Sequence, residues 1–123
     1  MLRDYLVLDI ETVPDSSRWH ADADAPPVFP PTWAHRIVSI GYAWLDRTYR
    51  LVHLGVARSG GATDDANERA RIDDLSRVIG RARPTLVTYN GRAGDLPGIA
   101  QRALGHGASI PWYYRERSVR TRY

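Results

Sequence analysis

The chain contains no cysteine and no lysine, and it has one methionine and one phenylalanine among its 123 residues. Without cysteine, disulfide bonds, thiol nucleophiles and thiolate zinc sites are all excluded. No stretch approaches the ~20 apolar residues that cross a bilayer, and the N-terminus lacks the pattern of a secretory signal peptide. These absences, with an ordinary 43% of hydrophobic residues, predict a single globular domain that is cytoplasmic and does not bind membranes.

Charge is distributed unevenly along the chain. Residues 1–74 contain eight Arg and twelve Asp or Glu, a net charge of −4, whereas residues 75–123 contain nine Arg and two acids, a net charge of +7. All 17 basic residues are arginine, which binds phosphate through paired hydrogen bonds better than lysine does. A basic half beside acidic residues suits an enzyme that acts on phosphodiesters. A solvated surface combined with biased codon usage explains the charge equally well.

Two carboxylates directly follow a short apolar segment near the N-terminus. The bulky residues 5–8 (YLVL) predict a buried strand, and Asp9 and Glu11 come next, one residue apart. Because side chains alternate along a strand, the two carboxylates are expected on the same face, about 7 Å apart. Their like charges repel unless a cation lies between them, so the spacing indicates a metal site. Acids that are merely solvated at a strand end are the alternative.

A long loop and a hairpin are expected after this strand. Residues 14–35 are rich in proline, aspartate, alanine and serine, which is typical of a loop, and long loops are usually functional or mobile. Residues 36–45 and 49–57 flank the short turn of residues 46–48, and apolar side chains alternate within the first of them. We interpret the two segments as an antiparallel hairpin that lies next to the first strand.

The second half of the chain predicts two helices separated by a buried strand. The first helix is expected to begin at Thr63 or Asp64 and to end before Pro84, and residues 85–89 (TLVTY) form the strand. Asp95 is expected to cap the second helix. The order strand, hairpin, helix, strand, helix predicts an α/β fold with a mixed sheet flanked by helices. Its first strand should lie in the centre of the sheet and carry the acids at its end, where such folds bind ligands.

A third carboxylate follows the second buried strand. Asp95 comes five residues after Asn90, within the segment YNGRAGDLP. Each residue has an ordinary structural explanation, because Asp before Leu-Pro is a good helix N-cap and Asn-Gly is a common turn sequence. The combination is more informative than its parts. A strand ending in Asp-x-Glu is followed about eighty residues later by a strand, an Asn, a loop and an Asp at a helix start.

These segments resemble two motifs of a known enzyme family. DIET at residues 9–12 is similar to the first exonuclease motif of the DEDD 3′–5′ exonucleases, which have a ribonuclease H-like fold, and YNGRAGDLP is similar to the second. Within that group, the chain resembles the bacterial predicted 3′–5′ exonucleases that are similar to the proofreading domain of family B DNA polymerases. The likeness covers essentially the whole of residues 1–123 as one domain, including HRIVSIGYAW, PTLVTYNGR and IPWYYRER.

The resemblance implies a metal-dependent exonuclease that releases nucleoside monophosphates from nucleic-acid 3′ ends, with single-stranded DNA as the expected partner. It implies two divalent ions, Mg²⁺ or Mn²⁺: Asp9 bridges both, Glu11 binds the one that activates water, and Asp95 supports the second. Two such ions stabilise the attacking and the leaving oxygen of an in-line displacement, and hard oxygen ligands suit them. The expected nucleic-acid contacts are Thr12, Asn90, Arg92, Trp112, Arg115 and Arg117.

The sequence departs from this family's pattern in two places. Relatives usually carry an aromatic residue just before the second-motif Asp, where this chain has Gly94. The third motif, a Tyr or His followed by a final Asp, is expected after the arginine-rich tail, but the chain stops at Tyr123. The resemblance therefore implies an N-terminal portion that lacks the fourth acidic ligand and the last strand–helix unit. Whether such a portion is active alone is open.

Two alternatives to a DNA exonuclease also stay open. One is a ribonuclease H-like nuclease that acts on RNA. The other is a non-catalytic remnant that binds single strands, because aromatic side chains stack on bases while arginines contact phosphates. The contacts of such a remnant would be Trp112, Tyr113, Arg115, Arg117, Arg120 and Arg122. The sequence does not distinguish these substrates and predicts no oligomeric state.

Overall fold

Four strands form one mixed sheet, and helices pack against it, in the computed structural model, which describes residues 3–57, 61–91 and 93–115. In chain order the elements are β1 (Tyr5–Pro14), the 3-10 helix η1 (Thr32–Ala34), β2 (His35–Leu45), β3 (Leu51–Val56), α1 (Asp65–Ala82), β4 (Thr85–Val87), α2 (Asp95–His106) and α3 (Pro111–Tyr114). The strand order is β3-β2-β1-β4, in which only β1 and β4 run parallel. The predicted mixed α/β sheet with an interior first strand is confirmed.

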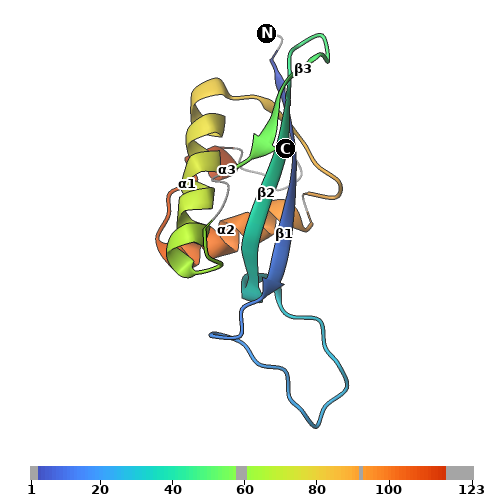
Figure 1. The fold of residues 1–123 in the computed structure, drawn as a ribbon, viewed down its shortest axis with the longest axis vertical. Helices are drawn as coiled ribbons and strands as arrows, with labels where there is room; N and C mark the ends of the chain where they lie inside the picture. The colour runs from blue at the N-terminus through green and yellow to red at the C-terminus, as the bar shows by residue number, and fades with distance from the viewer. Residues whose placement is uncertain (1–2, 58–60, 92, 116–123) are drawn as a thin grey trace.

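The three helices lie on one side of the sheet (Figure 1). The burial of β1 follows its alternating side chains, since Leu6 and Leu8 are 1% and 3% exposed against the helices, whereas Asp9 on the other face is exposed. The core between sheet and helices also contains Ile72 of α1 and Ile99 of α2, both fully buried. No helix of the described residues is both long and apolar enough to span a membrane.

The first helix begins as the sequence predicts. Asp64 is the N-cap of α1, and its carboxylate accepts a hydrogen bond of 2.8 Å from the backbone N–H of Asn67. The helix ends at Ala82, because Arg83 adopts a left-handed conformation with φ of 49° and Pro84 cannot continue the hydrogen-bond ladder. The prediction that Thr63 or Asp64 starts this helix is therefore confirmed for Asp64.

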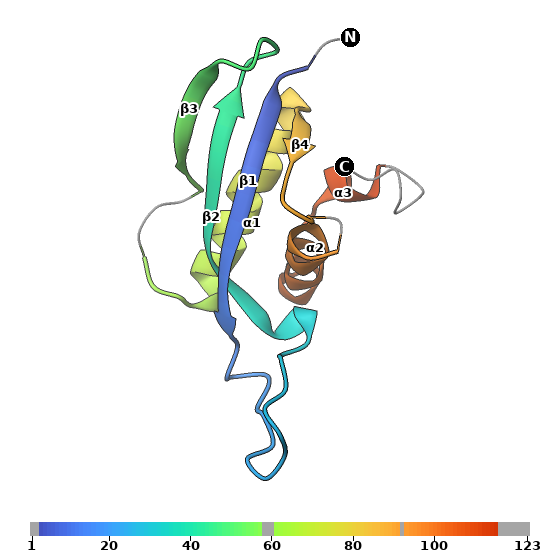
Figure 2. The same cartoon turned by 90° about the vertical axis from the view of Figure 1, so that its right-hand side faces the viewer.

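The lengths of β1 and β4 decide where the sheet edge is open. β1 continues to Pro14, beyond the predicted strand of residues 5–8, because it pairs with β2 as far as His35. The pairing has an irregularity between Glu11 and Thr12. β4 pairs with β1 only up to Val7, which makes β4 shorter than the predicted strand of residues 85–89. Beyond Val7, β1 has no strand neighbour on the β4 side within the described residues. Figure 2 shows this part of β1 facing α2 and the long loop below the sheet.

Candidate active site

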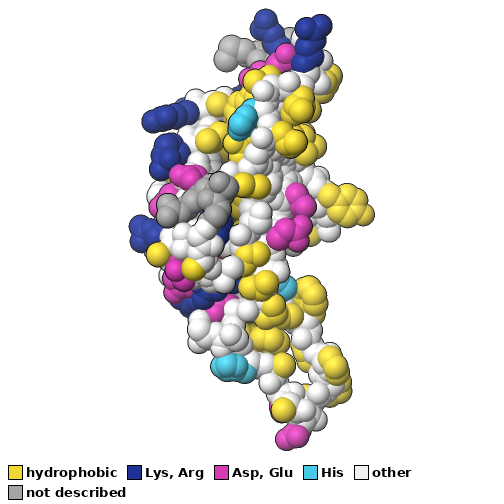
Figure 3. All heavy atoms as spheres, in the orientation of Figure 1, with side chains coloured by type: hydrophobic (Ala, Val, Ile, Leu, Met, Phe, Trp, Pro, Cys, Tyr) yellow, Lys and Arg dark blue, Asp and Glu magenta, His cyan; other side chains and the backbone are white. Residues whose placement is uncertain are grey.

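Asp9 and Glu11 lie on the open part of β1, on the face that the helices do not cover. Both are exposed, and they are separated by the half-buried Ile10. Their partners across the β1–β2 ladder are the small residues Gly41 and Ser39. In Figure 3, acidic side chains gather halfway along the sheet side of the molecule, apart from the arginines on the helix side.

Asp95 reaches the same edge of the sheet from α2. It lines one cavity with Ile10, the residue between Asp9 and Glu11, and the Ile10 N–H lowers its pKa. The expectation that Asp95 caps α2 is wrong: Gly94 is the N-cap, makes no side-chain cap bond, and Asp95 is the first helical residue. The position of the carboxylate explains this, because a carboxylate that lies beside the Ile10 N–H of β1 is not turned back toward the amides of its own helix.

The pKa of Asp95 reports its proximity to the other two acids. Burial raises this pKa above its ordinary value, and the charge of Asp9 raises it further. The Ile10 N–H lowers the pKa in part, and the charge of Glu11 adds a smaller increase. The structure therefore brings the three predicted carboxylates to one site. The three carboxylates are not tightly gathered. Among the described residues, acids and histidines with all ligand atoms within 4.8 Å of one another do form a group, but these three acids do not belong to it.

The turn before α2 explains how Asp95 is delivered to β1. Asn90 has a φ of 54°, a left-handed conformation that Asn tolerates, and its carbonyl accepts the N–H groups of Ala93 and Gly94 at 3.2 and 3.1 Å. Gly91 is obligatory, since a Cβ at this position would lie 1.8 Å from Thr88 Oγ1. Asn90 is exposed, and the role that the structure gives its backbone is to build this turn.

A cavity of about 350 Å³ adjoins Asp95 on the helix side of β1. Its lining includes Ile10, Thr12, Phe29 and His35. The Phe29 ring lies 5.0 Å from the His35 ring, and Thr12 Oγ1 lies 3.2 Å from His35 Nδ1. Thr12, a predicted nucleic-acid contact, thus lines a cavity beside the acids. The participation of Phe29 and His35 was not predicted, because both belong to the long loop and its return to β2.

The tail residues divide between core and surface. Trp112, predicted to contact nucleic acid, is 1% exposed, and its indole N–H donates to Ser76 Oγ at 3.1 Å. That prediction is wrong, because an indole packed in the core presents no face to a base. Tyr113 is likewise 8% exposed, whereas Arg115 lies exposed at the end of α3. The other predicted contacts and tail arginines lie outside the described residues: Arg92, Arg117, Arg120 and Arg122.

A buried network of charges lies beside the site, and it was not predicted from the sequence. Glu68 of α1 is fully buried. Its carboxylate accepts hydrogen bonds from the backbone N–H of Ile37 at 2.6 Å and from the Nε–H of Arg102 at 2.9 Å. His106 Nε2 lies 2.6 Å from Oε1 of the same carboxylate. Burial tends to raise the pKa of Glu68, but these partners hold it below the ordinary value. The signal was present, because Glu68 stands at helical spacing with the buried Ile72 of the same stripe.

This network is not a second metal site. Asp65, Glu68 and His106 have ligand atoms within 4.8 Å of one another, yet their carboxylates are already paired. Both Arg18 and Arg36 lie 2.7 Å from Asp65, and Arg102 pairs with Glu68. Each carboxylate thus has a cationic partner, which leaves no net negative charge for a metal ion to neutralise.

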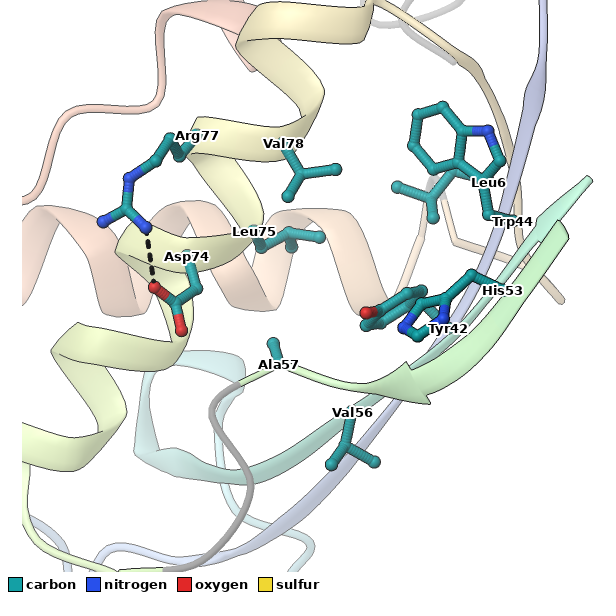
Figure 4. A pocket seen from close by; sticks show the side chains of 10 residues that line it. All are labelled: Leu6, Tyr42, Trp44, His53, Val56, Ala57, Asp74, Leu75, Arg77 and Val78. Carbon is teal, nitrogen blue, oxygen red and sulfur yellow. Dashed lines mark hydrogen bonds and ion pairs between the residues drawn. The ribbon is translucent and has the colours of Figure 1, made fainter.

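A larger cavity lies elsewhere, between α1 and the strands β2 and β3 (Figure 4). It has a volume of about 390 Å³ and is lined mostly by apolar and aromatic side chains, among them Tyr42, Trp44 and Leu75. An ion pair of 3.1 Å between Asp74 and Arg77 lies on its α1 side. It shares no lining residue with the cavity beside Asp95, so it is not part of the candidate site.

Comparison with known families gives one match. A family model described as a predicted 3′–5′ exonuclease related to the exonuclease domain of PolB matches residues 28–122. The match includes the turn and Asp95 but not Asp9 and Glu11 on β1. A search of curated proteins found no match. Because the family model spans most of the chain and the mixed sheet agrees with it, this chain belongs to the family of predicted 3′–5′ exonucleases related to the exonuclease domain of PolB.

Proposed function

We propose that the chain is a metal-dependent 3′–5′ exonuclease that removes nucleotides from DNA 3′ ends, with Asp9, Glu11 and Asp95 as its metal ligands. The observation that carries this proposal is the position of Asp95, which lines one cavity with Ile10, the residue between the other two acids, where the charges of Asp9 and Glu11 act on its carboxyl. Family membership supports the class of reaction. The choice of DNA, of Mg²⁺ or Mn²⁺, and of these ligands is part of the proposal.

The donor set fits divalent cations. All three groups are carboxylates, the oxygen ligands that Mg²⁺ and Mn²⁺ prefer. Within the described ranges no arginine or histidine forms an ion pair with any of them, in contrast to Asp15, Asp65 and Glu68, which are paired with arginine. Burial raises the pKa of Asp95, and the negative charges of Asp9 and Glu11 raise it further. Acids kept close together without a counter-charge are typical of functional sites.

The three acids of the proposed site have different roles. Asp9 and Glu11 are exposed, so they can bind ions that also contact a substrate, whereas Asp95 is half-buried and lies beside the Ile10 N–H. When bound, two ions would supply charge stabilisation at the attacking and leaving oxygens. The cavity next to Asp95 is the place for the terminal nucleotide, because the exposed ring of Phe29 offers a stacking surface there.

The non-catalytic alternative loses support from the burial of Trp112 and Tyr113. These were its stacking groups, and both belong to the core. Binding through tail arginines alone would not explain why three unpaired carboxylates lie at one edge of the sheet. Enzyme and remnant still differ in a direct measurement, which is the release of nucleoside monophosphates.

The test is an assay of 5′-labelled single-stranded DNA, and of RNA with the same sequence, with and without Mn²⁺. We expect the protein to shorten DNA from its 3′ end only when Mn²⁺ is present. Asp9→Asn and Glu11→Gln should each lower the rate by about 100-fold or more, the scale on which loss of a charge-stabilising group acts. Asp24→Asn, which changes an exposed acid of the long loop, is the matched control and should be unaffected. Binding without any metal-dependent shortening would instead establish the remnant.

A further inference from the structure

α2 is attached to β1 at two places along one face of the helix. Near its start, Asp95 lines one cavity with Ile10 of β1, and the Ile10 N–H lowers its pKa. Seven residues later, two helical turns along the same face, Arg102 donates from Nη2 to Asp15 Oδ2 at 2.9 Å, just after β1 ends. These two links are about 10 Å apart along the helix, at a rise of about 1.5 Å per residue. They set both the height and the rotation of α2 relative to the strand that carries Asp9 and Glu11.

Arg102 lies at the centre of the buried network. It is 4% exposed, and its donors reach three separate segments besides its own helix. Nη1 donates to the Trp33 carbonyl of η1 at 2.8 Å, and Nε donates to Glu68 of α1 at 2.9 Å, in addition to the bond to Asp15. The planar guanidinium holds its donors in a fixed fork, so these bonds specify one orientation of the side chain.

The partners of Arg102 are themselves held in place. Asp15 also accepts hydrogen bonds from Arg18 at 2.7 Å and from Arg36 at 3.2 Å, and Glu68 accepts the Ile37 N–H. Asp15 and Glu68 therefore cannot follow α2 if the helix shifts. Arg102 thus joins α2 to a support built from the end of β1, the start of β2 and α1.

Repulsion among the acids of the candidate site is the force that this support would resist. The charges of Asp9 and Glu11 act on Asp95 without a counter-ion, so they push the start of α2 away from β1. The Ile10 N–H favours the charged form of Asp95 and so opposes this push locally. Apolar packing of α2 resists separation but allows the helix to slide or rotate, because hydrophobic contacts are not directional.

We propose that Arg102 is a positioning residue of the candidate active site, which, by binding Asp15 and Glu68, holds Asp95 beside Asp9 and Glu11 before any metal ion arrives. This inference rests on the proposed function for its purpose, though not for its geometry. A purely stabilising role does not require a buried ion pair, because replacing such a pair with apolar groups is often neutral or stabilising. Directional bonds to three segments are what positioning needs.

The test compares Arg102→Met with Ile79→Ala, a core substitution on α1 that lowers stability without touching the network. Two quantities are measured well below the unfolding temperature. One is the affinity for Mn²⁺ alone by electron paramagnetic resonance, and the other is the hydrogen-exchange rate of the Ile10 amide without metal. Loss of a partner that orients metal ligands typically weakens metal binding by about 10- to 100-fold, and we expect that range for Arg102→Met.

We expect the Ile10 amide to exchange at least about tenfold faster in Arg102→Met, because Asp95, which lies beside this amide, is no longer held in place. In Ile79→Ala, both Mn²⁺ affinity and Ile10 exchange should stay within about twofold of the wild type, since local opening does not follow global stability. Arg102→Lys keeps a charge but loses the fork, so it should fall between wild type and Arg102→Met. If Arg102→Met fails to fold, Arg102→Lys carries the comparison.

The outcomes separate this inference from the proposed function. Wild-type Mn²⁺ affinity and wild-type Ile10 exchange in the folded Arg102 variant would overturn the positioning role while leaving the exonuclease proposal intact. Equal losses in Ile79→Ala would overturn it as well, because they would show a general effect of stability. If the wild-type protein itself binds no Mn²⁺, the proposed function fails. In that case the hydrogen-exchange rate of the Ile10 amide still tests whether Arg102 holds Asp95 beside β1.

Discussion

At the scale of single residues, the acids of this molecule fall into two classes. Asp15 and Glu68 are buried and surrounded by arginine donors, and hydrogen bonds outweigh the effect of burial on their pKa values, which lie below the ordinary range. Asp95 is partly buried beside two further acids, and its pKa is raised. The first class is neutralised within the fold. The second is left with negative charge to bind something from solution.

The raised pKa of Asp95 predicts how pH and mutation act on stability. The folded protein binds the Asp95 proton more tightly than the unfolded chain does, so ionised Asp95 destabilises the metal-free fold at neutral pH. This penalty disappears as pH falls through the raised pKa. We expect Asp95→Asn to increase the free energy of unfolding at pH 7, by a margin that shrinks on acidification, while Mn²⁺ affinity falls about tenfold or more.

Urea unfolding at several pH values, combined with Mn²⁺ titration, measures this prediction for Asp95→Asn. The control is Asp24→Asn, which should leave both quantities unchanged because Asp24 is exposed in the long loop. A marked loss of stability in Asp95→Asn at pH 7 would contradict the prediction. It would mean that the Ile10 N–H requires a charged group beside it and that repulsion from Asp9 and Glu11 is weak.

At the scale of elements, the short β4 and the turn after it create the site. Because β4 stops pairing at Val87, the edge of β1 is free for the start of α2. The turn then reverses the chain in a few residues, with Asn90 in a left-handed conformation and the Gly91 carbonyl accepting the Leu96 N–H at 2.9 Å. A longer β4 would occupy the edge that Asp95 reaches.

Two glycines allow this account of the turn to be tested. A methyl group at Gly91 would lie 1.8 Å from Thr88 Oγ1 and 2.5 Å from Thr88 Cβ, so Gly91→Ala must displace the turn and α2 with it. We expect this substitution to destabilise the protein by about 1–3 kcal/mol, as overpacking does, and to weaken Mn²⁺ binding. Gly80→Ala is the opposite case, because nothing lies within 4 Å of that position in α1.

Gly80→Ala should stabilise the protein by about 0.5–1 kcal/mol, the usual difference between the two residues inside a helix. Chemical unfolding of both variants gives the comparison, and Mn²⁺ titration shows whether the site changes with the turn. Should Gly91→Ala be as stable as the wild type and bind Mn²⁺ equally, the turn would be tolerant of a side chain. The delivery of Asp95 would then not depend on Gly91.

At the scale of the whole molecule, charge separates the two halves of the chain. The net charge of −4 in residues 1–74 and +7 in residues 75–123 places the positive excess in the second half. A positively charged surface binds the nucleic-acid backbone without regard to sequence and loses affinity as salt rises. Because Trp112 and Tyr113 are in the core, we assign the expected binding by the tail to charge and not to stacking.

We therefore predict weak binding of single-stranded DNA that falls steeply between two salt concentrations. Replacing four tail arginines with alanine should lower the affinity, and the salt slope should decrease by about 0.7 for each phosphate that the tail no longer neutralises. The four are Arg115, Arg117, Arg120 and Arg122. Filter-binding titrations measure both quantities, and Mn²⁺ affinity should stay unchanged because none of these residues is a proposed ligand.

A second fourfold variant from the acidic half removes the same charge elsewhere and serves as the control. Its substitutions to alanine are at Arg3, Arg47, Arg50 and Arg58. It should retain most of the binding if the position of the positive charge matters. Equal losses in the two variants would show that net charge alone attracts DNA, and equal binding by the tail variant and the wild type would leave the tail without a role.

The sequence by itself determined the features that depend on neighbouring residues. Alternation along a strand places Asp9 and Glu11 on one face, the Asp64 side chain caps the helix it precedes, and the order of apolar segments gives a mixed sheet. The likeness of the two exonuclease motifs was also readable, since it lies in short contiguous segments. These properties follow from backbone geometry and local hydrogen bonding, which do not need the rest of the chain.

Only the tertiary structure decided the contacts between segments far apart in the chain. Arg102 meets Asp15 across 87 residues and Glu68 across 34, and Trp112 meets Ser76 of α1 across 36. Asp95 lies beside the Ile10 N–H of β1 and does not cap α2 for the same reason. Which partner a buried polar group finds depends on how the helices and sheet pack, and a buried group left without a partner would cost stability.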